Sequence, residues 1–143
     1  AQEGSGIISA ISKDGGLSFE IEDGIRIPMG DTYDRLHAFS PEIVRIQNGG
    51  YRMYYAGYSE LNRAFILTAT SDDGLHWTKD PEPVISPGDS KFDRVKCSEM
   101  ALMILPATAG KPPHYRLFYE ACDGTTSDER GVWRIVGRTT KKM

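Results

Sequence analysis

The stretch Ser71-Asp72-Asp73-Gly74-Leu75-His76-Trp77 decides the fold, because a near copy, Ser12-Lys13-Asp14-Gly15-Gly16-Leu17-Ser18-Phe19, begins 59 residues earlier. Both stretches follow a strand-like run, and both have the Ser, Asp and Gly content of a tight turn. Two copies of one turn at this spacing are typical of a repeat built from a small sheet. The sequence therefore predicts a repeated, all-β architecture.

The same register continues through the elements that follow the turns. Tyr51–Tyr55 returns as Tyr115–Tyr119, and Ile66–Thr70 returns as Ile135–Thr139, after longer loops that absorb the change in offset. Agreement in order across several elements indicates a true repeat. The pairs of positions that lie 59 residues apart are Ser12 and Ser71, Asp14 and Asp73, Pro28 and Pro87, and Asp34 and Asp93.

Each complete repeat contains four predicted antiparallel strands, which is the content of one β-propeller blade. The strands are an inner one beginning near Ser40 or Cys97, an aromatic one at Tyr51 or Tyr115, a β-branched one at Ala64 or Val132, and a short outer one at Val84. The chain is then a single partial propeller domain over residues 1–143, with the end of one blade at 6–30, a full blade at 34–89 and most of another at 93–140.

This division gives about two and a quarter blades, and a propeller ring needs four to eight. Open ends expose strand edges that invite pairing. We therefore expect the ring to be closed either by oligomerisation or by sequence outside this chain.

Several smaller features follow from the same patterns. Ile7–Ser12 is β-branched and predicts a strand, and Gln47-Asn48-Gly49-Gly50 predicts a hairpin turn with Gly at positions of positive φ. Lys91–Leu102 could be mistaken for a helix, but its repeat partner contains Ser40-Pro41, which argues against one.

Composition excludes several classes of function. The 143 residues are 39% hydrophobic and 26% charged, which is ordinary for a globular domain, and the net charge of −3 gives no basic surface for nucleic acid. No apolar run approaches the roughly 20 residues of a membrane span. No leader is visible, although one could have been removed before Ala1, so the compartment stays open.

The two cysteines, Cys97 and Cys122, are too few and too far apart for a disulfide framework or a zinc site. We predict two free, partly buried thiols. The sequence predicts no metal site and no cofactor.

The first turn resembles the Asp-box, S-x-D-x-G-x-[ST]-[WF], of BNR repeats in sialidase-like propellers, and it matches at Ser12, Asp14, Gly16, Ser18 and Phe19. The second turn is one residue shorter and is closer to the S-x-D-G-x-x-W turn of five-bladed furanosidase-like glycoside hydrolases. In both families this turn is structural: Ser and Asp cap backbone donors and the aromatic residue packs between sheets.

The resemblance to the glycoside hydrolases implies catalytic carboxylates at the starts of the inner strands, where a hydrolase needs a pair roughly 5–10 Å apart. Glu99 is the candidate general acid, with Asp34 or Asp93 as its partner. The furanosidase-like pattern would place an aspartate at Ser40, so that carboxylate is missing. The arginine triad and tyrosine–glutamate pair of a sialidase cannot be placed either.

Each candidate catalytic or ligand-binding residue also has a purely structural interpretation. Asp34-Arg35 and Asp93-Arg94 recur in both units, which favours ion pairs or turn caps over catalysis. Glu120 either faces the channel or pairs with a cation such as Arg116. The tyrosines could stack on sugars, but packing between blades is favoured. The candidate ligand-binding residues are Arg35, His37, Arg94, Lys96 and Glu120, of which His37 and Lys96 occupy equivalent positions.

Two functions follow from this sequence. The first is a glycoside-hydrolase-like propeller unit that acts on carbohydrate by acid–base chemistry. The alternative is a non-catalytic propeller-forming module for binding or assembly. The non-catalytic module would bind a carbohydrate or a protein through its channel face, or serve as an assembly unit. The partners we expect are a carbohydrate ligand for the first function and further copies of the chain that complete the propeller, and neither nucleic acid nor membrane.

Overall fold

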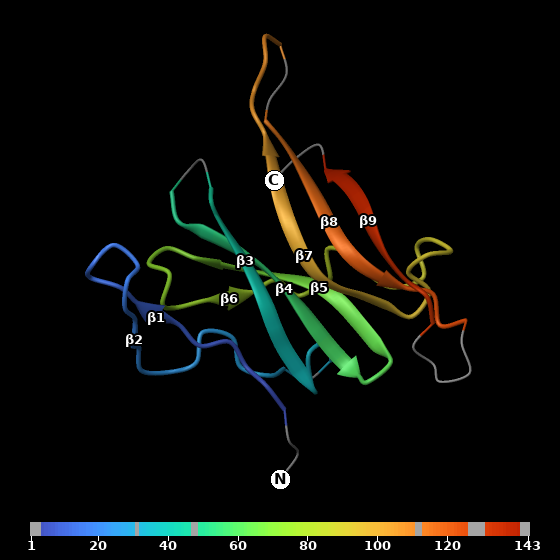
Figure 1. Ribbon diagram of the computed structural model, residues 1–143, viewed down its shortest axis with the longest axis horizontal. Coiled ribbons are helices and arrows are strands. Elements are labelled where there is room, and N and C mark those ends of the chain that lie inside the picture. Colours follow the sequence, from blue (N-terminus) through green and yellow to red (C-terminus); the bar gives the residue numbers. More distant parts are fainter. Residues whose placement is uncertain (1–3, 31, 47–48, 111–112, 126–130, 141–143) are drawn as a thin grey trace.

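The strands form a two-stranded sheet and a seven-stranded sheet. One parallel pairing divides the larger sheet into two antiparallel parts, so three units follow one another in the order of the sequence (Figure 1). This computed structural model describes residues 4–30, 32–46, 49–110, 113–125 and 131–140. All regular elements in that part of the chain are strands, so the predicted all-β class is confirmed, and the open sheets are consistent with part of a propeller. We name the three units N-terminal (residues 5–27), central (37–85) and C-terminal (96–140).

The N-terminal unit is the smallest. It contains β1 (Ala10–Ile11) and β2 (Glu20–Ile21), which pair antiparallel, and an isolated bridge between Ile7 and Ile27. The strand predicted over Ile7–Ser12 is therefore regular only at β1. Its central counterpart is a full strand because it is paired on both sides, whereas this segment has a partner on one side only.

The central unit is an antiparallel sheet of β3 (His37–Arg45), β4 (Tyr51–Glu60), β5 (Arg63–Ser71) and β6 (Thr78–Lys79). The outer strand predicted at Val84 is wrong in extent: it consists of β6 and a separate bridge between Ile66 and Ile85. Pro81 and Pro83 lie between these two pieces, and proline cannot donate to a strand ladder.

The C-terminal unit contains β7 (Lys96–Leu105), β8 (His114–Cys122) and β9 (Trp133–Thr140), again antiparallel. Most of Lys91–Leu102 is thus strand, as predicted, and not helix. In the hairpin between β3 and β4, Gly49 and Gly50 have the predicted positive φ, 93° and 79°, whereas residues 47 and 48 lie outside the described residues.

The strand pairing repeats with the offset found in the sequence. The parallel bridge between Ser5 and His37 recurs as the pairing of Ala64 with Lys96, which joins the central and C-terminal sheets. Both members move by 59 residues. This agreement shows that the sequence repeat is also a repeat of three-dimensional structure.

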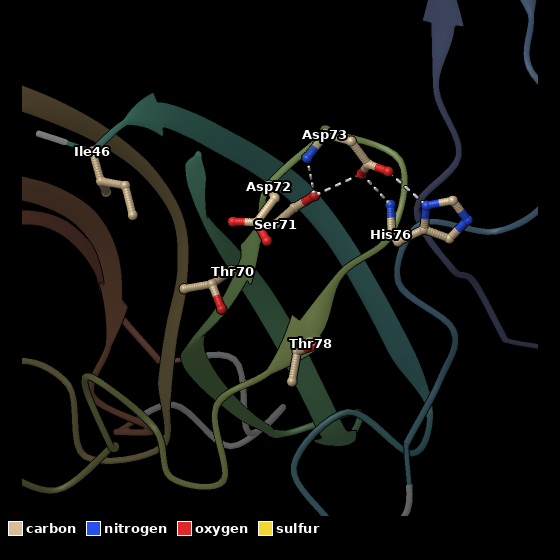
Figure 2. Close-up of a pocket in the computed structure, with 7 residues that line it drawn as sticks. All are labelled: Ile46, Thr70, Ser71, Asp72, Asp73, His76 and Thr78. Carbon is tan, nitrogen blue, oxygen red and sulfur yellow. Dashed lines mark hydrogen bonds and ion pairs between the residues drawn. The ribbon is translucent and has the colours of Figure 1, made fainter. Parts of the chain in front are cut away.

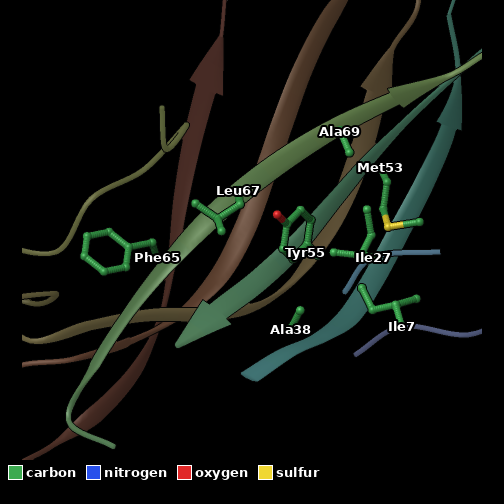
Figure 3. Close-up of a cluster of buried hydrophobic side chains, with 8 residues drawn as sticks. All are labelled: Ile7, Ile27, Ala38, Met53, Tyr55, Phe65, Leu67 and Ala69. Carbon is green, nitrogen blue, oxygen red and sulfur yellow. The ribbon is translucent and has the colours of Figure 1, made fainter. Parts of the chain in front are cut away.

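Two hydrophobic clusters hold the three units together, one on each side of the central sheet. The first contains Ile7 and Ile27 of the N-terminal unit against Met53, Tyr55 and Leu67 of the central unit (Figure 3). The second joins the central and C-terminal units through Val44, Tyr54, Ile66, Ile85, Cys97, Leu117, Tyr119 and Ala121. Successive residues of β4 thus face opposite clusters, as alternation along a strand requires.

The burial of the tyrosines and of the cysteines agrees with two predictions. Tyr54, Tyr55 and Tyr119 are each less than 5% exposed and pack between units, so the packing role favoured for the aromatic residues is confirmed for these three. Cys97 and Cys122 are free thiols and buried, as predicted.

Candidate functional site

Two β-bulges mark equivalent points of the inner strands. In β3 the register shifts between Phe39 and Glu42, and in β7 it shifts between Ser98 and Met100. Ser40 lies in the first bulge with a φ of 52°, a conformation that non-glycine residues rarely adopt. Glu99 occupies the equivalent point of the second, so the C-terminal unit carries a carboxyl group where the central unit has a hydroxyl.

Glu99 forms a pair with Glu120 of the adjacent strand β8. Both side chains are half-buried, and Ser98, beside Glu99, lies opposite Glu120 in the ladder. Burial raises the pKa of Glu120, and the charge of Glu99 and a hydrogen bond between the two side chains raise it further. Glu120 therefore retains its proton to higher pH than a solvated glutamate does.

Lys96 begins the same strand and is buried, with 6% of its surface exposed. Its ammonium group lies 5.3 Å from the ring centre of Trp133 and 5.9 Å from that of Tyr58, within the range of cation–π attraction. Trp133 comes from β9 and Tyr58 from β4, so Lys96 bridges the central and C-terminal units.

His37 occupies the repeat position of Lys96 in β3. Its Nδ1 lies 3.1 Å from Ser5 Oγ, and its ring meets the edges of Phe39 and Tyr58. Burial raises the pKa of Tyr58, its interaction with Ser98 opposes this rise, and the charges of Glu99 and Glu120 add to it. The residues joined by these contacts, which we call the inner cluster, are His37, Tyr58, Lys96, Ser98, Glu99, Glu120 and Trp133.

Asp34 and Asp93 lie in two equivalent buried networks, separate from the Glu99–Glu120 contact. Asp34 Oδ2 accepts from the hydroxyl of Tyr55 at 3.0 Å and from Lys79 Nζ at 2.6 Å. In the next unit, Tyr119 donates to Asp93 Oδ2 at 2.7 Å and an Arg138 nitrogen lies 3.2 Å from that oxygen.

This placement supports the structural alternative for both aspartates. The paired cations are not the adjacent arginines of the Asp-Arg dipeptides. Arg35 and Arg94 are exposed instead, and Arg35 donates to the Ser59 carbonyl and to Glu60. The inner cluster thus brings together three of the predicted ligand-binding residues, His37, Lys96 and Glu120, with the predicted acid Glu99.

The repeated turns are capped as expected. In the second turn, Asp73 Oδ1 accepts from the backbone nitrogen of His76 at 2.8 Å (Figure 2). It also accepts from Leu75 N at 2.8 Å, and Ser71 Oγ accepts from Gly74 N at 2.9 Å. Asp14 and Ser12 make the same kind of bonds in the first turn. Three of the residues that line the hollow beside the second turn, Ser71, Asp73 and His76, therefore already take part in the bonds of the turn.

The aromatic residues of the two turns differ. Trp77 packs against the first hydrophobic cluster and donates its indole N–H to the Gly74 carbonyl at 2.9 Å. Phe19 is 64% exposed. The predicted packing between sheets therefore holds for Trp77 alone, because the described chain places no sheet on the far side of the N-terminal unit.

Three members of the inner cluster were not predicted as site residues: Tyr58, Ser98 and Trp133. A signal for two of them was present in the repeat. Tyr58 aligns with Cys122, and Trp133 aligns with Ala64, so both units place unlike residues at these strand ends. Such differences between repeats indicate positions that the common fold does not dictate.

Comparison with known proteins gives a fold. No protein-family model matches this chain, and no curated protein does. A solved glycoside hydrolase has a TM-score of 0.66 and 20% sequence identity to it, over 94% of this chain and 35% of that protein. The chain has a glycoside-hydrolase-like fold.

Two further solved structures have a fold similar to that of this chain. An N-acetylgalactosamine deacetylase from F. plautii, solved with blood group B trisaccharide, has a TM-score of 0.60 at 16% identity and covers 89% of this chain and 39% of that one. A glycoside-hydrolase-like protein from Parabacteroides distasonis has a TM-score of 0.58 at 20% identity, over 94% and 42%. The chain thus spans 35–42% of the length of these three structures.

No helix of the described residues is long and apolar enough to cross a membrane. The same residues contain no group of three His, Cys, Asp or Glu side chains placed to hold a metal ion.

Proposed function

We propose that this chain is part of a glycoside-hydrolase-like β-propeller that acts on carbohydrate at the inner cluster. The observation that carries the proposal is the Glu99–Glu120 carboxyl pair at the bulge of β7, beside a buried cation and two aromatic rings. The glycoside-hydrolase-like fold supports a carbohydrate-related function.

The carboxyl pair suits a general acid. Cleavage of a glycosidic bond needs a carboxylic acid that still holds its proton near neutral pH and can give it to the leaving oxygen. In our proposal Glu99 delivers this proton, and Glu120, whose pKa is raised by burial and by Glu99, lies beside it as a second carboxylic acid. Trp133, which is 40% exposed, offers a ring face on which a sugar can stack.

Hydrolysis also needs a second carboxylate as base or nucleophile. Asp34 and Asp93 are the candidates from the sequence, and each lies beside a cation. Although burial opposes it, the hydrogen bonds of Asp93 and the charge of Arg138 lower its pKa and so favour the charged form that such a role requires. The two aspartates are only 4% and 0% exposed, however, which favours a supporting role for them. We propose that the second carboxylate comes from a unit that completes the ring.

The alternative is a non-catalytic module for binding or assembly. Ser40 stands where the resembling glycosidases have an aspartate, which favours this alternative for the chain by itself. The rings and cation of the inner cluster could then hold a glycan without cleaving it. Catalysis and binding thus share one site and differ only in the use of Glu99.

Ring completion is supported by apolar residues at both ends of the row of units. Ile66 of the central unit is fully buried, whereas its equivalent in the C-terminal unit, Ile135, is 69% exposed. Leu67 is 4% exposed, and its N-terminal equivalent Ile8 is 56% exposed. We propose that further sheet units cover both faces, supplied by a second copy of the chain or by sequence outside it.

The experiment is hydrolysis of a panel of aryl glycosides by the wild-type chain, Glu99→Gln and Glu60→Gln. Glu60 is an exposed glutamate and serves as the matched control. Mass by light scattering shows whether each protein assembles. We expect activity in the assembled wild type, at least about 100-fold less in Glu99→Gln, and no change in Glu60→Gln. An assembled protein with no hydrolysis of any substrate would favour the non-catalytic alternative.

A further inference from the structure

Lys96 is the exception among the buried charged side chains of the described residues. Asp34, Asp93 and Asp123 each have a cationic partner within 3.2 Å, and Arg26 donates to backbone carbonyl oxygens. The Lys96 ammonium group has cation–π contacts with Tyr58 and Trp133, and no described carboxylate lies within ion-pair distance of it.

Two aromatic rings are a weak substitute for a counter-ion. A buried ammonium group loses most of its hydration, and a cation–π contact returns only part of that loss. Fully buried lysines are otherwise found paired. The arrangement is the one expected of a cation whose anionic partner arrives with a ligand.

The surroundings place this cation at the proposed carbohydrate site. Trp133, whose ring faces Lys96, lines a surface hollow with Glu120, Arg134 and Ile135. Arg134 is already engaged, because it lies 2.6 Å from the carboxylate of Asp123. Lys96 contacts the hollow through the Trp133 ring and, unlike Arg134, has no partner among the described carboxylates.

The other titratable groups of the inner cluster include His37 and the Glu99–Glu120 pair. His37, at the repeat position of Lys96, presents an imidazole. Burial and the neighbouring Glu99 raise the pKa of Glu120, and when Glu120 is protonated the pair carries one negative charge fewer.

We infer that Lys96 binds the anionic substituent, a carboxylate or a sulfate ester, of a sugar held at the inner cluster. The inference rests on the proposed carbohydrate function and narrows the ligand to acidic glycans. Tyr58 and Trp133 hold the ammonium group in place, and the ligand supplies the negatively charged partner of Lys96.

The test measures binding by calorimetry to matched oligosaccharides: uronic acid oligosaccharides and their carboxyl-reduced forms, and sulfated oligosaccharides and their desulfated forms. The proteins are wild type, Lys96→Met, which keeps the apolar stem, and Lys96→Arg. We expect the wild type to bind an acidic member at least about tenfold more tightly than its neutral counterpart. Lys96→Met should lose this preference and keep its affinity for the neutral form, whereas Lys96→Arg should retain the preference.

The outcomes separate the two proposals. If the wild type binds acidic and neutral forms equally, or if Lys96→Met keeps the preference, the role of Lys96 is overturned and the carbohydrate function stands. If the wild type binds none of these glycans, both are overturned. Thermal unfolding of each variant checks its fold, and if Lys96→Met does not fold, the wild-type comparison of matched pairs decides.

Discussion

The central and C-terminal units share one framework and differ at the inner ends of their strands. Shortly before the inner strand of each unit, a buried aspartate accepts a hydrogen bond from a tyrosine of that unit's second strand, Asp34 from Tyr55 and Asp93 from Tyr119. Each aspartate also has a cation beside it. Both units also have a bulge at the same point of the inner strand. These features repeat because every unit must be packed against its neighbours in the same way.

The chemistry does not repeat. The central unit has Ser40, Ala56 and His37 where the C-terminal unit has Glu99, Glu120 and Lys96. A substitution of a small or neutral residue by a charged one at three equivalent positions is not required for packing. The comparison teaches that the shared positions carry stability and that the differing positions carry function.

The largest expected effect comes from the shared framework. Asp93→Ala should lower the free energy of unfolding by about 3–5 kcal/mol, because it leaves Tyr119 and Arg138 without their common acceptor. Asp34→Ala should cost a similar amount. Urea denaturation measures both, with Glu60→Gln as the surface control. A loss below about 1 kcal/mol in either variant would contradict a common structural role.

We also expect Asp93 to make the stability of the fold depend on pH. Burial alone would raise the pKa of Asp93, but hydrogen bonds from Tyr119 and Ser90 and the charge of Arg138 outweigh it, so the pKa is lowered on folding. Such a group adds stability above its unfolded pKa of about 4, and this contribution is lost as the pH falls through the folded value. The stability of the wild type should therefore decline below about pH 4, and the decline should be smaller in Asp93→Asn.

A second comparison concerns the aromatic residues of the repeated turns. Trp77→Ala should destabilise the chain by about 2–4 kcal/mol, since the ring packs on the first hydrophobic cluster. Phe19→Ala should change stability by less than about 0.5 kcal/mol, because the ring is exposed. Thermal unfolding of dilute protein measures both. An effect of Phe19→Ala as large as that of Trp77→Ala would mean that another sheet covers Phe19.

The fold could be predicted from the sequence because the residue types of a turn and the alternation of apolar and polar residues along a strand are local properties. The spacing of Ser12 and Ser71 predicted the offset at which the strand pairing recurs. The strand at Ile7–Ser12 was predicted too long, because its regularity depends on a partner strand that local pattern cannot reveal.

The candidate site could be predicted from the sequence only in part, because its contacts are not local. Glu99 was found from its place before an apolar strand, but its pairing with Glu120 depends on the register of β7 and β8, and that register is shifted by a bulge. Tyr58 reaches Lys96 from another unit. Contacts across a bulge or between sheets cannot be derived from spacing along one strand.

The smallest expected effect tests the differing positions directly. Carboxyl-carbon NMR should show Glu120 titrating above the ordinary glutamate value of 4.5 in the wild type, and closer to it in Glu99→Gln, where burial remains but the neighbouring charge is gone. A raised folded pKa favours the protonated form, so this contribution to stability is present at low pH and lost as the pH rises through the folded value. Glu99→Gln should therefore be more stable than the wild type at pH 7, by less than about 1 kcal/mol, and no more stable at pH 4. If Glu120 titrates identically in both proteins, the two carboxyl groups are not coupled. Glu99 and Glu120, which have no carboxyl counterparts in the central unit, would then act independently and not as an acid pair.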